Sequence, residues 1–172
     1  FMNQMPKTIL VTGGLGYIGS HTVIELVEKN FNVVILDNLS NSTIEVLSYL
    51  QEITGKILPF YQLDLTKDDL DVLPKNIDGI IHFAAFKHVY ESVKYPLKYY
   101  QNNINSLLRL LDWMQKREIQ YFIFSSSCTV YGETDTLPVT EDTPFGFPIS
   151  PYAHTKQIGE IVLQNFIKTY RS

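Results

Sequence analysis

Short apolar runs rich in β-branched residues alternate along this chain with longer stretches whose apolar residues recur every three or four positions. The runs predict strands, and the stretches with helical spacing predict helices. The predicted strands lie at 8–12, 32–36, 56–63, 78–83 and 121–124. One predicted helix follows the first strand, with an apolar face formed by Ile18, Val23, Ile24, Leu26 and Val27. The other predicted helices lie at 43–54, 67–73 (with Thr66 as N-cap), 96–116 and 152–170. This alternation is typical of an α/β fold with a parallel sheet.

A glycine cluster joins the first predicted strand to the first predicted helix. Gly13, Gly16 and Gly19 lie three positions apart, and Gly14, Gly16 and Gly19 also have the G-x-G-x-x-G spacing of dinucleotide-binding loops. Glycines there permit the tight turn, the close approach of a diphosphate to the backbone, and the packing of the helix on the strand. The helix N-terminus then attracts the diphosphate. We therefore expect residues 7–172 to form one Rossmann-type domain with a doubly wound parallel sheet flanked by helices.

Asp37, at the end of the second predicted strand, indicates which dinucleotide would bind. It follows the glycines by about 20 residues, the distance expected for the acid that accepts a hydrogen bond from the adenosine ribose. A carboxylate would repel a 2′-phosphate, and the next residues, 38–42, contain no Arg or Lys to neutralise one. The sequence therefore predicts NAD rather than NADP.

The whole chain sets limits on partners and location. Its 172 residues suffice for about one domain, and its net charge of −4 without a basic block argues against a nucleic-acid surface. Cys128 is the one cysteine, which suits a reducing compartment. No apolar run approaches a membrane span and no signal peptide is evident. We expect a cytoplasmic protein with no membrane partner.

Tyr152 and Lys156 are the strongest candidates for catalysis. They lie one helical turn apart on the same face of the last predicted helix. A free tyrosine has a pKa of about 10, and a neighbouring ammonium stabilises its phenolate so that it can act as a base. Tyr90 and Lys94 have the same spacing, but no hydroxyl cluster precedes them, and we interpret this second match as accidental.

Ser127 is the third candidate catalytic residue, in the serine-rich segment after the fifth predicted strand. A hydroxyl there can donate to and accept from a substrate oxygen and the tyrosine. Ser125 and Ser126 are better candidates for satisfying backbone groups of the turn.

Several motifs together resemble the extended short-chain dehydrogenase/reductase family and, within it, the UDP-glucose 4-epimerases. The resemblance covers the chain from about Lys7 to its end. The motifs that carry it are residues 12–22, 37–42, 64–65, 82–87, 99–103, 122–132 and 150–156.

The resemblance implies a full set of site residues. The implied NAD contacts are Gly13, Gly16, Tyr17, Ile18, Gly19, Asp37, Asn38, Leu39, Ser40, Asn41, Ser42, Asp64, Leu65, Phe83, Ala84, Ala85, Lys87, Asn102, Ser125, Tyr152 and Lys156. The implied substrate contacts are Lys87, Ser127, Thr129 and Tyr152, and no metal is implied. The catalytic residues would be Ser127, Tyr152 and Lys156.

The implied reaction is the interconversion of UDP-galactose and UDP-glucose by transient oxidation at the sugar 4-carbon. Sugar-nucleotide dehydratases of this family carry an Asp-Glu pair where Cys128 and Thr129 stand, so a dehydratase is a poor fit. Another UDP-sugar epimerase, a decarboxylase, or an NAD-binding module without catalysis remain alternatives. Ala85 and Phe86 stand where this family commonly has Gly and Leu, and Phe86 could reshape the sugar pocket.

The resemblance also implies a longer parent protein. Such enzymes continue with a second region that supplies most UDP-sugar contacts, so we expect this chain to be an N-terminal fragment. Because catalysis depends on fine positioning, the isolated fragment is expected to have little or no activity. The full-length protein is expected to be a homodimer.

Overall fold

The computed structural model describes residues 6–135 and 137–170, which group into two compact units. The sheet unit contains the described residues up to Ala84 together with Asp112–Ser125. The helical unit contains Ala85–Leu111 together with the described residues from Ser126 onward.

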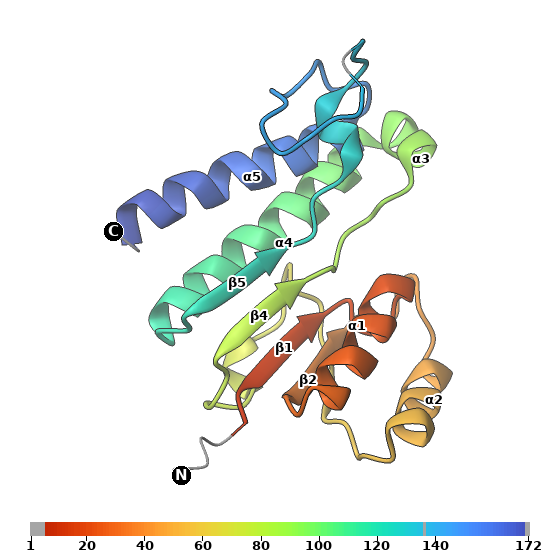
Figure 1. The fold of residues 1–172 in the computed structure, drawn as a ribbon, viewed down its shortest axis with the longest axis vertical. Helices are drawn as coiled ribbons and strands as arrows, with labels where there is room; N and C mark the ends of the chain where they lie inside the picture. Colours follow the sequence, from red (N-terminus) through yellow and green to blue (C-terminus); the bar gives the residue numbers. More distant parts are fainter. Residues whose placement is uncertain (1–5, 136, 171–172) are drawn as a thin grey trace. The chain divides into compact units, whose positions relative to one another are not determined.

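The sheet unit is built on five parallel strands in the order β3-β2-β1-β4-β5 (Figure 1). The strands are β1 (Thr8–Thr12), β2 (Asn32–Asp37), β3 (Phe60–Gln62), β4 (Gly79–His82) and β5 (Tyr121–Phe124). At the carboxyl edge, Thr12 pairs with Leu36 on one side and with His82 on the other. This strand order confirms the expected Rossmann-type sheet.

The central strand β1 is buried because β2 and β4 flank it and helices pack on the sheet. All five residues of β1 are buried, as expected for a central strand of a parallel sheet. Helices α1 (Tyr17–Glu28) and α2 (Glu45–Thr54) contribute Val23, Val27 and Leu50 to a core shared with β1 and β2. Gly55 ends α2 in the left-handed conformation, with φ of 65°.

The helical unit contains most of α4 (Pro96–Lys116) together with α3 (Val89–Lys94), the 3₁₀-helix η2 (Cys128–Tyr131) and α5 (Pro151–Tyr170). Helices α4 and α5 run side by side (Figure 1), joined by hydrogen bonds from Tyr100 to His154 and from Asn103 to Thr155. Both α3 and η2 pack against α5. No helix within residues 6–135 and 137–170 is long and apolar enough to cross a membrane.

Two predicted elements differ from the structure in length or in type. The strand predicted at 56–63 pairs with β2 only over Phe60–Gln62, because Pro59 has no N–H and the Leu58 N–H donates to Gln51 instead. Thr66 does not cap a helix at 67–73, because both its N–H and its hydroxyl donate to Asp64. The segment instead forms a short 3₁₀-helix, η1 (Leu70–Val72).

The sequence analysis also missed α3. It has only six residues, and Val89, Tyr90 and Val93 are exposed, so no apolar face marks it as helical. The second tyrosine–lysine pair, Tyr90 and Lys94, lies on this helix. Because the Tyr90 side chain is 77% exposed, it has none of the burial that distinguishes Tyr152.

Candidate functional site

In the sheet unit, the glycine loop between β1 and α1 has no room for side chains. Gly13 has φ of +66°, and a Cβ atom there would lie 2.8 Å from the Ala84 nitrogen. A Cβ atom on Gly19 would lie 2.2 Å from the Gly13 carbonyl oxygen. Gly13 and Gly19 therefore keep the N-terminal turn of α1 tight against the end of β1.

The N-terminus of α1 is open for an anion. Gly16 is its N-cap, no side chain caps it, and its first turn carries no acidic residue. The Tyr17 and Ile18 side chains are 76% and 57% exposed. Backbone N–H groups at such a helix end bind phosphates, so this loop fits the diphosphate of NAD.

Asp37 holds the neighbouring loops and keeps an acceptor position. Its Oδ1 accepts hydrogen bonds from the Leu39 N–H (2.9 Å) and the Ser42 hydroxyl (2.8 Å), and its Oδ2 accepts from the Leu15 N–H (3.1 Å). Each carboxylate oxygen has about two acceptor positions. Among the described residues this leaves Oδ2 one position that fits a ribose hydroxyl.

Other predicted cofactor residues lie at the same carboxyl edge of the sheet. The Ala84 N–H approaches the Thr12 hydroxyl at 3.4 Å, and the Ser125 N–H donates to the His82 carbonyl oxygen. Asp64 follows β3, whereas the Leu65 side chain is buried in the core, so only the Leu65 backbone is available to a ligand. The sheet unit thus brings the glycine loop, Asp37, Ala84 and Ser125 to one edge.

In the helical unit, Ser127 is the N-cap of η2. Its Oγ accepts hydrogen bonds from the Thr129 N–H (3.3 Å) and the Thr129 hydroxyl (2.9 Å). Ser127 therefore stabilises the turn, a role that the sequence analysis gave to Ser125 and Ser126. In both bonds the Ser127 oxygen accepts, so its O–H remains a donor for a substrate oxygen.

Tyr152 and Lys156 are both buried on α5, with 9% and 5% of each residue exposed. The Lys156 Nζ lies 6.0 Å from the centroid of the Tyr152 ring, which confirms that the two side chains share a face. The Tyr152 N–H donates to the Ser92 hydroxyl, which ties the start of α5 to α3. Burial lowers the pKa of Lys156 from 10.5 to about 8.

This lowered pKa predicts a pH-dependent effect of Lys156→Met. The folded chain holds the lysine proton less tightly than the unfolded chain, so burying the charged form costs stability below pH 8 and the cost falls as pH rises from about 8 to about 10.5. We expect Lys156→Met to raise the free energy of unfolding by up to about 3 kcal/mol near neutral pH.

Chemical denaturation across this pH range measures that gain, which should shrink as pH rises. The matched control is Lys168→Met, an exposed lysine on the same helix, with an expected change within about 0.5 kcal/mol at every pH. A gain for Lys156→Met that does not depend on pH would contradict the prediction.

Sequence reasoning missed three residues that hold the helical unit together. Asn103 bonds Phe86 and Thr155, the Gln157 Nε2 donates to the Val130 and Gly146 carbonyl oxygens, and Glu160 accepts from the Ser126 hydroxyl. The paired asparagines at 102–103 were the available signal, because asparagine is a poor residue for a helix interior. Asn102 itself is half-buried and donates to Asn103, while Lys87 is exposed.

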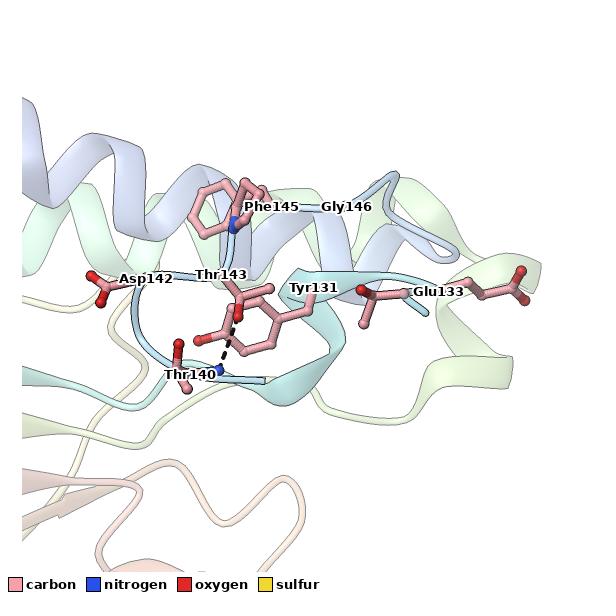
Figure 2. Close-up of a pocket in the computed structure, with 9 residues that line it drawn as sticks. Tyr131, Glu133, Thr140, Asp142, Thr143, Phe145 and Gly146 are labelled. Atoms are coloured by element: carbon pink, nitrogen blue, oxygen red, sulfur yellow. Dashed lines mark hydrogen bonds between the residues drawn. The ribbon is translucent and has the colours of Figure 1, made fainter. Parts of the chain in front are cut away.

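A hollow of about 410 Å³ also lies in the helical unit, in the loop after η2. Figure 2 shows its lining side chains and the hydrogen bond from the Thr140 N–H to the Thr143 hydroxyl (2.9 Å). Its lining residues are Tyr131, Glu133, Thr134, Thr140, Asp142, Thr143, Pro144, Phe145 and Gly146. None of these is a predicted site residue. Among the described residues, no cluster of His, Cys, Asp or Glu could hold a metal ion.

Known proteins resemble the chain in both sequence and structure. The model of the NAD dependent epimerase/dehydratase family matches residues 9–172. The UDP-glucose 4-epimerase of Dictyostelium discoideum is 48% identical over 167 residues, covering 95% of this chain and 48% of that protein. The Bacillus subtilis (strain 168) UDP-glucose 4-epimerase is 49% identical over 160 residues, covering 91% and 47%.

A solved structure extends this similarity to the fold. The crystal structure of UDP-glucose 4-epimerase from Bifidobacterium longum in complex with NAD⁺ and UDP superimposes with a TM-score of 0.89 at 42% identity. The match covers 94% of this chain and 49% of that one. The chain spans about half the length of the curated relatives it matches.

Proposed function

Because the chain belongs to the NAD-dependent epimerase/dehydratase family, we propose that it is the NAD-binding half of an enzyme that interconverts UDP-galactose and UDP-glucose. The family resemblance inferred from the motifs is confirmed. The proposed enzyme is an isomerase of galactose metabolism that works in the cytoplasm as a homodimer. Exposed Leu97 and Leu108 on α4 offer apolar surface for such a dimer.

The observation that carries this proposal is the buried pair Tyr152–Lys156 on α5, the helix against which η2 packs with Ser127 at its N-cap. A phenol, an ammonium and a hydroxyl are the groups needed to move a proton at a sugar hydroxyl. In a module that only binds nucleotide, Lys156 could hold the nicotinamide ribose, but no proton transfer would require the phenol of Tyr152.

NAD, when bound, would supply reversible hydride acceptance at the sugar 4-carbon. The proposed holders are the Gly13–Gly19 loop for the diphosphate, Asp37 for the adenosine ribose, and Lys156 for the nicotinamide ribose, with Lys87 and Asn102 positioning the cofactor.

In the proposed mechanism, Tyr152 removes the proton of the 4-hydroxyl and later returns it. The ammonium form of Lys156 stabilises the phenolate of Tyr152, and the lowered pKa of Lys156 makes this effect sensitive to mildly alkaline pH. Ser127 donates its O–H to the reacting oxygen and so orients it. Inversion at the 4-carbon would require the oxidised sugar to rotate, so that hydride returns to its opposite face.

The nucleotide content of the purified chain tests the cofactor half of the proposal. We expect near-equimolar NAD, without NADP, when the chain is denatured and its supernatant is measured by mass spectrometry. The reason is that the glycine loop and Asp37 both lie within the chain. As a control, the chain is incubated with NAD or with NADP at equal concentrations, and only NAD should be taken up. A chain that contains no NAD and takes up none would contradict the prediction.

The activity itself is tested on the full-length protein by following conversion of UDP-galactose to UDP-glucose. Turnover of only other UDP-sugars, or release of carbon dioxide from a UDP-uronate, would favour the alternative enzymes instead.

A further inference from the structure

Two segments of the helical unit touch at the C-terminal end of η2. The Gly146 N–H donates to the Val130 carbonyl oxygen (3.2 Å). A Cβ atom on Gly132, where φ is +60°, would lie 2.6 Å from the Phe147 carbonyl oxygen. The backbone at residues 130–132 therefore lies directly against the backbone at residues 146–147.

The side chain of Gln157, on α5, binds both of these segments. Its Nε2 donates to the Val130 carbonyl oxygen (2.7 Å) and to the Gly146 carbonyl oxygen (2.8 Å). An amide nitrogen has two hydrogens, so both donors are used. Because Gln157 is only 6% exposed, water cannot easily replace these bonds, and their loss would leave two buried carbonyl groups short of a donor.

A second side chain on α5 holds the other end of η2. Glu160, three positions after Gln157 and so on the same side of the helix, accepts a hydrogen bond from the Ser126 hydroxyl. Ser126 directly precedes Ser127, the N-cap of η2. Helix α5 therefore binds the chain on both sides of Ser127, at residue 126 and at residue 130, and the same helix carries Tyr152.

The hydrogen bonds inside η2 fix its shape but not its place on α5. The Val130 N–H donates to the Ser127 carbonyl oxygen (3.1 Å), and the Thr129 N–H and hydroxyl donate to the Ser127 Oγ. All of these bonds would move with η2 as a unit. The bonds from Gln157 and to Glu160 join that unit to the helix, so they act on the position of Ser127 relative to Tyr152.

We propose that Gln157 and Glu160 are positioning residues that hold the Ser127 hydroxyl in register with the Tyr152 phenol. In this role neither residue touches a reacting group, and both act through η2. The inference rests on the proposed function, because the roles of Ser127 and Tyr152 come from it.

The test is a double-mutant cycle in the full-length protein, with UDP-galactose as substrate. Gln157→Met removes both donors at similar volume. Misplacing a reacting group by about 1 Å costs about 10²-fold, so we expect Gln157→Met to lower kcat by about 10-fold or more. Ser127→Ala should lower kcat by itself. When Gln157→Met is added to Ser127→Ala, kcat should fall by less than about twofold, because the hydroxyl that Gln157 positions is already gone.

Ser126→Ala tests the second arm of the proposal in the same cycle. It removes the hydroxyl that donates to Glu160 and leaves Gln157 in place. We expect a smaller loss of kcat than for Gln157→Met, and again a loss that nearly disappears when Ser127→Ala is present.

Two control variants separate positioning from other effects. Gln164→Met makes the same substitution at an exposed glutamine of α5 and should leave kcat unchanged. Leu110→Val shortens a wholly buried side chain of α4, so it should lower the melting temperature without changing kcat. All assays are run at a temperature where circular dichroism shows each variant folded.

Each outcome decides between the alternatives. If Gln157→Met lowers only the melting temperature, as Leu110→Val does, or lowers kcat equally with and without Ser127→Ala, the inference is overturned. If Gln157→Met does not fold, Ser126→Ala decides by the same criterion. Unmutated protein without turnover removes the proposed function and this inference together, whereas active protein with uncoupled variants removes the inference alone.

Discussion

Replacing Tyr152 by phenylalanine in the full-length protein is expected to lower kcat for UDP-galactose by about 10²- to 10⁴-fold, while bound NAD stays near the unmutated level. The change removes only the phenolic oxygen that takes the proton. The ring stays to fill its buried position, and the hydrogen bond from the Tyr152 N–H to Ser92 is kept. Steady-state kinetics and the nucleotide content of the purified variant measure the two effects separately.

Tyr90→Phe is the matched control, because Tyr90 and Lys94 repeat the spacing on α3 and both side chains are exposed. It should leave both kcat and NAD content unchanged. A Tyr152→Phe variant with unchanged turnover would remove Tyr152 from the chemistry. If the unmutated full-length protein binds NAD but turns over no UDP-sugar, the non-catalytic alternative would be favoured.

Replacing Gly19 by alanine should abolish NAD binding and destabilise the chain. The added Cβ would lie 2.2 Å from the Gly13 carbonyl oxygen and 2.9 Å from the Gly14 Cα, and both are backbone atoms that cannot swing away. The N-terminus of α1 must then move off β1, which removes the N–H groups from the diphosphate. We expect a loss of stability of about 3 kcal/mol or more. Mass spectrometry of released nucleotide and a thermal melt measure the two effects.

Gly55→Ala separates this effect from the general cost of replacing a glycine. Gly55 has φ of +65° but nothing within 4 Å of the added Cβ, so we expect only backbone strain of about 1–2 kcal/mol and normal NAD content. Full NAD occupancy in Gly19→Ala would show that the loop tolerates a side chain, contrary to the geometry.

The strands of the sheet could be predicted from the sequence because each is specified by an apolar pattern within its own segment. Apolar runs such as 8–12 and 121–124 became strands with the predicted ends, and the 96–116 pattern became α4 with the predicted bounds. The elements that failed depend on particular hydrogen bonds. The Thr66 N–H donates a hydrogen bond to Asp64, and the Leu58 N–H donates one to Gln51. A hydrophobic pattern indicates neither of these hydrogen bonds.

The sequence by itself determined the parallel sheet, the glycine loop and the tyrosine–lysine pair, because period, glycine spacing and one helical turn are properties of neighbouring residues. Tertiary structure alone decided the rest. Burial of the Lys156 side chain lowers its pKa, Ser127 caps a 3₁₀-helix, and Asn103 bonds partners 17 and 52 positions away. Burial and long-range hydrogen bonds arise only when distant segments pack, so no local pattern records them.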